Sequence, residues 1–141
     1  MIAPNDELVA LLALLDERPA LRDERAGATS WSTIASEVSL RGSAVVVWEQ
    51  LHAAVLDGSA GRGGPLERAR KLLARWRGSD FALVTVLDEG YPLALRGIHQ
   101  LPPVLFYRGR LVADEVGVSV VGSRRPSERG LAIASHVAAG L

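Results

Sequence analysis

The residues best suited to binding a charged ligand lie in one short turn late in the chain. An apolar run at residues 116–121 stops at Gly122, and a small, basic turn leads to a helix that we expect Ser127 to cap. The side chains of Arg124 and Arg125 supply permanently charged, forked N–H donors that suit phosphate. The N-terminus of a helix adds free backbone N–H groups and the positive end of its dipole. This strand, turn and helix start therefore predicts an anion-binding site.

Small residues complete the candidate site. Gly122 has no Cβ, so it allows tight backbone geometry and close approach of a ligand, and the Ser123 hydroxyl can donate to an oxyanion. Gly130 lies one turn inside the helix, where a side chain would block packing on the strand or access to the ligand. Each feature alone is typical of an ordinary turn with solvated arginines. Together they favour phosphate binding by Gly122, Ser123, Arg124, Arg125, Ser127 and Gly130.

The glycine spacing excludes the standard nucleotide-binding fingerprints. Gly117, Gly122 and Gly130 do not fit G-x-G-x-x-G, and the pattern G-x-x-x-x-G-K-[ST] does not occur. The sequence therefore predicts neither NAD nor ATP, and we expect no cofactor.

Neither metal chemistry nor nucleophilic catalysis is indicated. The three histidines lack the spacing of metal ligands, and the sequence contains no cysteine. Ser123 is not part of a G-x-S-x-G elbow, and no His or Asp is placed to activate it. Asp88 and Glu89 precede a Gly-Tyr-Pro sequence and are typical of a turn. We therefore expect a binding protein and not an enzyme, with no catalytic residue and no metal site.

The tryptophans and tyrosines could contact a nucleic acid or could have structural roles. Trp31, Trp48 and Trp76 could stack on nucleobases, but their spacing among apolar helix positions favours packing in the core. Tyr91 and Tyr107 flank the segment between two expected strands. We expect both tyrosines to hold that segment in place.

Composition and charge indicate a packed core and a basic second half. Hydrophobic residues make up 48% of the 141 residues. The net charge is zero, but it is −5 before residue 58 and +5 from residue 58 onward. Either the second half meets an anion, or an acidic and a basic part attract each other. Because no apolar run approaches the roughly 20 residues that span a bilayer, and the start lacks a basic signal-peptide region, we expect a cytoplasmic location.

The first part of the chain is expected to be a compact all-helical domain at residues 1–57. Apolar side chains recur at helical spacing over residues 6–15, from about residue 29, and over residues 43–56. Ser43 is the expected cap of the last of these helices. The charged stretch between the first two helices is expected to be a loop.

A glycine-rich linker at residues 58–64 is expected to join this domain to an α/β part at residues 65–141. Pro65 suits the first turn of a helix over residues 65–77. The basic face of that helix could contact a phosphate backbone, although a solvated face is the simpler interpretation. Beyond it, apolar and partly β-branched runs indicate buried strands. The expected elements are strands at 81–87, 104–107 and 116–121, a short helix at 93–98 and a final helix from Ser127.

Two segments of the second part resemble a known family. Residues 118–130, VSVVGSRRPSERG, look like the signature of the DNA-processing protein A (DprA/Smf) family, in which Gly-Ser-Arg follows a strand and a glycine lies in the next helix. Residues 91–109, YPLALRGIHQLPPVLFYRG, resemble that family's Tyr-Pro-x-x-Leu and Pro-x-x-Leu-(Phe)-Tyr-x-Arg/Lys-Gly segment. The spacing of the two segments also agrees. The resemblance is specific over residues 80–141 and loose elsewhere.

The resemblance implies a fold and a function. The fold is α/β: an N-terminal all-helical domain similar to a sterile-alpha-motif (SAM) domain, then the truncated start of a Rossmann-like parallel sheet domain. The function is the binding of single-stranded DNA in DNA uptake and natural transformation (competence), with loading of the RecA recombinase. The full-length protein would form a homodimer and would not associate with membranes.

The resemblance also assigns roles to residues of the turn. Gly122, Ser123 and Arg124 match the Gly-Ser-Arg that contacts DNA phosphate in the family. Gly130 matches its helix glycine, and Arg125 matches a position that is often basic. The family's other DNA-contacting lysine and its partner-binding surfaces would lie beyond the last residue. We therefore expect this chain to be an incomplete fragment whose second half is marginally stable, with an uncovered sheet edge and apolar helix face.

Two alternatives stay open from the sequence. The first is a Rossmann-like enzyme of the lysine-decarboxylase-like or phosphoribohydrolase type, which binds a nucleoside phosphate and also places a Gly-Ser-Arg-like turn after a strand. Its later Gly-rich, Glu-containing loop is missing here. The second is a helical adaptor, in which residues 5–57 bind a partner protein and the α/β part supports them.

Overall fold

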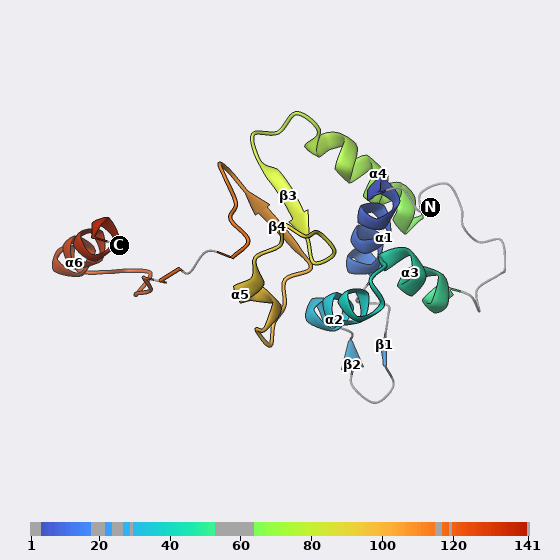
Figure 1. Ribbon diagram of the computed structural model, residues 1–141, viewed down its shortest axis with the longest axis horizontal. Coiled ribbons are helices and arrows are strands. Elements are labelled where there is room, and N and C mark those ends of the chain that lie inside the picture. The colour runs from blue at the N-terminus through green and yellow to red at the C-terminus, as the bar shows by residue number, and fades with distance from the viewer. Residues whose placement is uncertain are drawn as a thin grey trace.

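A computed structural model describes residues 4–17, 22–23, 27–28, 30–52, 64–114, 117–118 and 120–140 of the chain. Helices α1 to α4 gather on one side of a two-stranded hairpin, and α6 stands apart on the other side (Figure 1). In chain order the elements are α1 (Pro4–Glu17), β1 (Arg22–Asp23), β2 (Gly27–Ala28), α2 (Trp31–Arg41), α3 (Ala44–His52), α4 (Pro65–Trp76), β3 (Ala82–Thr85), α5 (Leu93–Arg96), β4 (Val104–Tyr107) and α6 (Glu128–Ala139).

The helices of the first part begin and end at local capping signals. The Ser30 hydroxyl accepts a hydrogen bond from the Thr33 N–H at 3.1 Å at the start of α2. Gly42 ends α2 with a φ of 68°, a left-handed conformation that favours glycine, and its N–H donates to the Val38 carbonyl at 2.9 Å. The described residues confirm the predicted helical character. They also show a short antiparallel pair, β1 with β2, within the expected loop.

The start of α3 is held by a side chain from a distant helix. The Glu7 carboxylate on α1 accepts from the Ser43 hydroxyl at 2.7 Å, the Ala44 N–H at 2.6 Å and the Val45 N–H at 3.2 Å. Ser43 in turn accepts from the Val46 N–H at 3.2 Å, which confirms it as the predicted cap. Because these N–H groups have no partner within the helix, Glu7 both satisfies them and ties α1 to α3.

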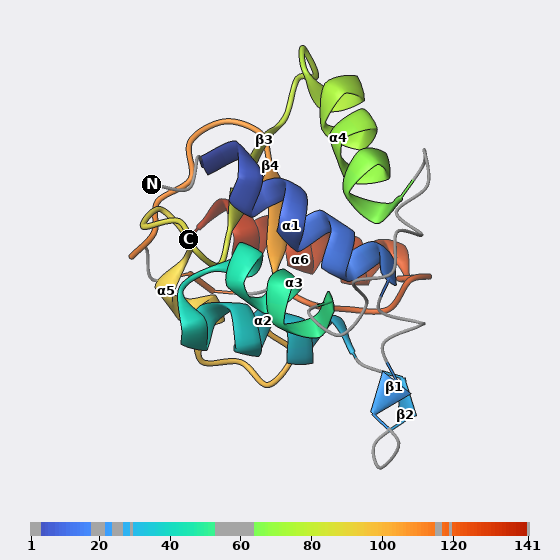
Figure 2. The ribbon, with the colours of Figure 1, turned by 90° about the vertical axis from the view of Figure 1, so that its right-hand side faces the viewer.

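Helix α1 is the centre of the fold because two of its faces are covered. Leu11 and Leu14 pack with α2, α3 and the hairpin residues Val84 and Val86. The other face packs against Ala69 on α4. Figure 2 shows α1 passing between α4 on one side and α2 and α3 on the other. The residues of α1 from 9 to 14 are all buried as a result.

Among its described residues, the second part forms an antiparallel hairpin where a parallel sheet was expected. Strands β3 and β4 are antiparallel, with Leu83 opposite Phe106. The connection returns because its ends are tied together: the Val86 N–H donates to the Pro103 carbonyl at 3.1 Å. Strand β4 covers the predicted residues 104–107, whereas β3 is shorter than the strand predicted at 81–87. The Rossmann-like parallel arrangement is not confirmed.

The expected third strand is absent from the described residues of 116–121. Gly117, Val118, Val120 and Val121 belong to no strand, and Val121 is 89% exposed. An apolar run becomes a strand only when a neighbouring strand supplies hydrogen-bond partners, and no described segment does so here. The prediction of a strand was therefore wrong for these residues; residues 116 and 119 lie outside the described part.

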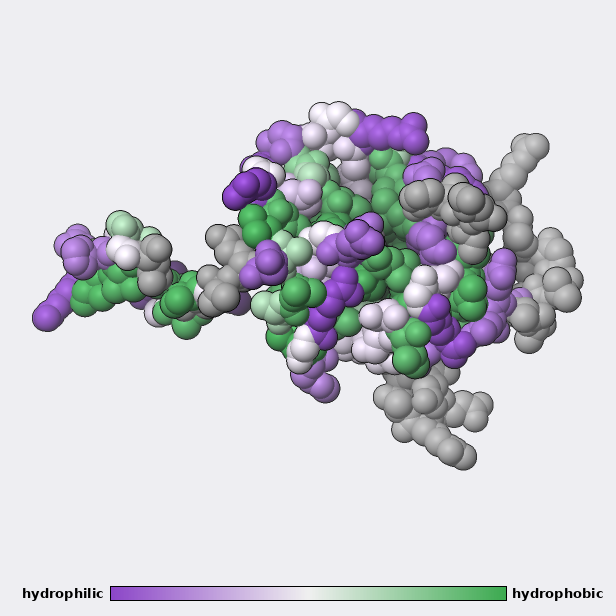
Figure 3. Space-filling model, in the orientation of Figure 1, coloured by the Kyte–Doolittle hydropathy of each residue, from purple (hydrophilic) through white to green (hydrophobic). Residues whose placement is uncertain are grey.

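The C-terminal helix is present as predicted but is not packed. It begins at Glu128, directly after its cap Ser127. Figure 3 shows apolar (green) side chains on the surface of this projecting segment. On this helix Leu131, Ile133 and Val137 are exposed. None of the described helices is both long and apolar enough to cross a membrane.

Candidate functional site

The turn at residues 122–127 is an exposed loop shaped by its own side chains. The Ser123 hydroxyl accepts a hydrogen bond from the Arg125 N–H at 3.2 Å. This contact closes the turn locally and leaves the side chains of Arg124 and Arg125 exposed. Within the described chain, no carboxylate lies at ion-pair distance from either arginine. Two permanent positive charges are therefore presented next to each other on one turn.

The helix that follows the turn has a regular N-terminal cap. Ser127 has extended backbone, with φ −70° and ψ 159°, and its hydroxyl accepts from the Gly130 N–H at 3.2 Å. The Leu131 N–H donates to the Ser127 carbonyl at 3.0 Å. Among the described residues, no acceptor meets the N–H groups of Glu128 and Arg129. These two amides can donate to an anion, whereas the Gly130 N–H already donates to the Ser127 hydroxyl.

The two glycines of the predicted site differ in their surroundings. A Cβ at Gly122 would meet no atom within 4 Å, and Gly122 is not among the glycines with positive φ. Its φ is one that any residue can adopt, so the tight backbone geometry expected of Gly122 is not seen, and close approach of a ligand stays a prediction. A Cβ at Gly130 would lie 3.4 Å from the Ser127 Oγ. This is close to an ordinary contact, so the cap does not require glycine, and the packing on a strand expected for Gly130 is not seen among the described residues.

All six predicted site residues lie in one stretch of chain, and no other described element approaches them. The turn stands away from the hairpin and the four N-terminal helices (Figure 1). Its charge is set by Arg124, Arg125 and Arg129 against Glu128, all of them exposed. This local concentration of positive charge and free amides can bind an oxyanion without sequence-distant partners. The role of these residues stays a prediction.

The Tyr-Pro segment upstream is structural. The Tyr91 hydroxyl donates to the Pro102 carbonyl at 2.6 Å, and the ring is fully buried in the core. The Arg96 guanidinium lies 5.1 Å from the centre of that ring and donates to the Val86 and Asp88 carbonyls. Burial raises the pKa of Tyr91 above its usual value near 10, and the Arg96 charge lowers it in part. The prediction that Tyr91 holds this segment is confirmed.

The neighbouring acidic residue also has a structural role. The Asp88 carboxylate accepts from the Thr85 N–H at 2.6 Å and from the Thr85 hydroxyl at 2.8 Å. It therefore closes the turn at the end of β3, as the sequence predicted for Asp88.

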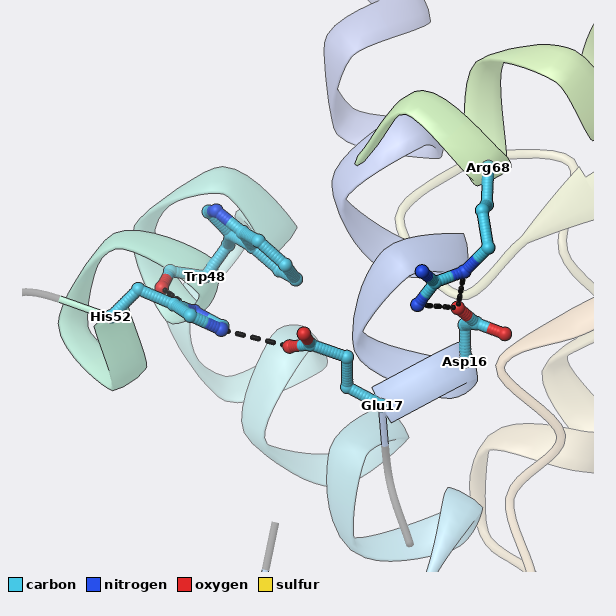
Figure 4. Close-up of polar contacts among 5 residues, drawn as sticks. All are labelled: Asp16, Glu17, Trp48, His52 and Arg68. Atoms are coloured by element: carbon cyan, nitrogen blue, oxygen red, sulfur yellow. Dashed lines mark hydrogen bonds and ion pairs between the residues drawn. The ribbon is translucent and has the colours of Figure 1, made fainter. Parts of the chain in front are cut away.

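The basic helix α4 is partly neutralised by acidic neighbours. Arg68 reaches the Asp16 carboxylate on α1 through Nη2 at 2.6 Å and Nε at 2.7 Å (Figure 4). Lys71 pairs with Glu67 at 3.6 Å on the same helix. The Arg68 contact fastens α4 to α1. The attraction between an acidic and a basic part, one of the two interpretations of the charge asymmetry, thus has a direct structural counterpart.

Two of the three tryptophans, Trp48 and Trp76, pack against the core and also contact other rings. Trp48 packs against the core, and the His52 ring stacks on it at 3.8 Å while His52 contacts Glu17 at 2.8 Å (Figure 4). Trp76 packs against the core residues around Ala69, as predicted, and also contacts Phe81 and Phe106 in a group of rings. This group was not predicted from the sequence, because its members come from a helix, a loop and a strand and share no spacing.

The comparison with known protein families concerns the part of the chain that contains the hairpin and the turn. An exposed arginine pair beside free helix N-terminal amides is an arrangement found in proteins that bind phosphate groups. Residues 82–141 match the family of DNA recombination-mediator protein A, so that the match begins with β3 and includes both motifs. It confirms the resemblance over this segment and supports a role in DNA processing and recombination mediation. Searches of curated proteins and of solved structures found no match. No finding supports the nucleoside-phosphate enzyme.

Proposed function

We propose that this chain binds single-stranded DNA through phosphate contacts made by the turn at residues 122–130. The observation that carries the proposal is the exposed pair Arg124 and Arg125 beside two free helix amides, inside the segment that matches the recombination-mediator family. Phosphate contacts carry no sequence information. Binding should therefore be independent of sequence and should weaken as salt is added.

The setting of this activity is part of the same proposal. The chain would act in the cytoplasm on DNA taken up in natural transformation, and would help to load the RecA recombinase. The full-length protein would do so as a homodimer, without catalysing a reaction. The match of residues 82–141 to DNA recombination-mediator protein A supports the part of this setting that concerns DNA processing and recombination mediation.

The proposal is tested by removing one arginine at a time. Arg124→Ala and Arg125→Ala should each weaken the binding of labelled oligo(dT), measured by fluorescence anisotropy over a series of salt concentrations. Each lost phosphate contact should reduce the slope of log affinity against log salt by about 0.7. Arg41→Ala is the matched control, because it removes one exposed arginine charge from α2, where Arg41 pairs with Glu37.

The result separates a local contact from a general effect of charge. The proposal requires that both turn variants lose more affinity than the Arg41 variant at every salt concentration. Affinity that is unchanged in both turn variants would contradict it.

A further inference from the structure

A second surface near the hairpin combines aromatic rings with positive charge. Trp76 at the end of α4, Phe81 before β3 and Phe106 on β4 contact one another edge to face. The ring centres of Trp76 and Phe106 are 4.9 Å apart, and those of Phe81 and Phe106 are 5.3 Å apart. We call these three residues the aromatic cluster.

The chain folds back at Gly78 to build the cluster. Gly78 has a φ of 85°, which favours glycine, and the Ser79 N–H donates to the Trp76 carbonyl at 3.0 Å. This tight turn returns Phe81 to the side of Trp76. The edge-to-face contacts then fix the three rings relative to one another.

The cluster is partly open to solvent, because Trp76 and Phe81 are half-buried and Phe106 is exposed. Phe106 is 51% exposed, whereas its strand neighbours Leu105 and Tyr107 pack against the core. A shallow hollow of about 460 Å³ is lined by the cluster together with Tyr107 and Arg108. A large aromatic ring that stays half-exposed beside a hollow offers a free face on which a flat ligand can stack.

Guanidinium groups lie on two sides of the cluster. Arg108 lines the hollow and pairs with the Asp80 carboxylate at 2.9 Å, with both side chains more than 70% exposed. Arg77 lines a neighbouring hollow of about 220 Å³ that shares Trp76 and Phe81 with the first. The exposed Arg108–Asp80 pair is weak, so Arg108 can leave Asp80 for a stronger anion.

We propose that the aromatic cluster is a base-stacking site for single-stranded DNA, with Arg108 and Arg77 meeting the flanking phosphates. This inference rests on the proposed function and adds the residues that contact bases. Single strands are held by aromatic faces on which bases stack and by positive groups along the backbone. The cluster supplies both within one surface, and its charge complements a polyanion and not a purely apolar partner. The Asp80 carboxylate lies beside Arg108, and its negative charge opposes binding unless Arg108 neutralises it.

The stacking site is tested with two probes that have equal backbone charge. Oligo(dT) and an abasic oligodeoxynucleotide of the same length are titrated against the full chain and its variants. Phe106→Leu should bind oligo(dT) about ten-fold more weakly, because it loses one stacked base, while its affinity for the abasic strand stays unchanged. Phe106→Tyr keeps the ring and should bind both probes like the parent chain. Comparison of the two variants shows whether binding depends on the aromatic ring or only on a large side chain at this position.

A second variant tests the charge of the surface. Asp80→Asn removes the carboxylate that competes for Arg108, so both probes should bind more tightly than to the parent chain. Glu49→Gln on α3 removes one exposed negative charge elsewhere and should have a smaller effect. Equal effects of the two variants would overturn the role of Arg108.

The outcomes separate this inference from the proposed function. If Phe106→Leu leaves the affinity for oligo(dT) unchanged while the Arg124 and Arg125 variants weaken it, the cluster does not bind bases and the turn proposal stands. The surface then serves packing or a protein partner. If Phe106→Leu weakens binding and the turn variants do not, the stacking site stands and the turn proposal fails.

Discussion

Single hydrogen bonds and ring contacts define most of the chemistry at the residue scale. Tyr91 illustrates this, because its buried ring and the 2.6 Å bond from its hydroxyl to Pro102 hold the connection between β3 and β4. Arg124 and Arg125 represent the opposite case, since they are exposed and have no described carboxylate partner. A buried group of the first kind contributes to stability, whereas exposed cations of the second kind are accessible to a ligand.

Tyr91 should make the free energy of unfolding decrease at alkaline pH. Because its pKa is raised in the folded state, the neutral form is favoured there. The resulting contribution of Tyr91 to the free energy of unfolding is fully present below the pKa of tyrosine in the unfolded chain, near 10. It is lost as the pH rises through the pKa of Tyr91 in the folded chain. Tyr91→Phe lacks this ionisation but also lacks the bond to Pro102, so we expect it to cost about 1 kcal/mol at neutral pH.

Urea denaturation at neutral and at alkaline pH measures both effects. The difference in unfolding free energy between the parent chain and Tyr91→Phe should shrink above about pH 10. A difference that stays constant over the whole range would show that Tyr91 does not titrate as its burial implies.

At the scale of elements, α1 decides how the helices and the hairpin assemble. Its residues contact α2, α3 and the hairpin on one face and α4 on the other. Polar contacts reinforce this position: Glu7 caps α3, and Asp16 pairs with Arg68 on α4. Loss of packing on α1 should therefore affect all of these elements together.

Leu11→Ala tests this central role. Leu11 is fully buried, so its truncation should lower the unfolding free energy by about 2–5 kcal/mol through lost burial and a residual cavity. Leu40→Ala is the matched control, because Leu40 is 81% exposed and its truncation should change stability by less than about 0.5 kcal/mol. Chemical denaturation followed by tryptophan fluorescence measures both. Similar losses in the two variants would show that α1 is not the centre of the core.

At the scale of the whole molecule, the packed part and the C-terminal segment differ in their surroundings. Helix α6 and the residues before it project from the body and expose apolar side chains (Figure 3). A helix of this length is marginally stable without tertiary packing. The candidate phosphate-binding turn therefore lies in the least supported part of the described fold.

Hydrogen exchange should show this contrast directly. We expect the backbone amides of α6 to exchange many times faster than those of α1, because opening α6 breaks few buried contacts. Peptide-level exchange followed by mass spectrometry measures both helices in one experiment, and α2, packed on the core, is the internal reference. Equal protection of α6 and α1 would contradict the projecting arrangement.

The sequence by itself determined the local features of this protein. The caps at Ser43 and Ser127, the proline start of α4 and the turn at Asp88 were all predictable, because each depends on neighbours within a few residues. The two motifs also lie in continuous stretches, and the family match over residues 82–141 confirms the resemblance they carry. The candidate turn belongs to the same group, since its donors are adjacent in the chain.

Only the tertiary structure decided how distant residues meet. The antiparallel pairing of β3 with β4, the position of Glu7 at the start of α3 and the contact of Phe106 with Trp76 join residues that share no sequence pattern. An apolar run shows that a segment is suited to burial, but the partner that buries it is chosen by the packing of the whole chain. For this reason residues 82–85 became a strand, and the described residues of the similar run at 116–121 did not.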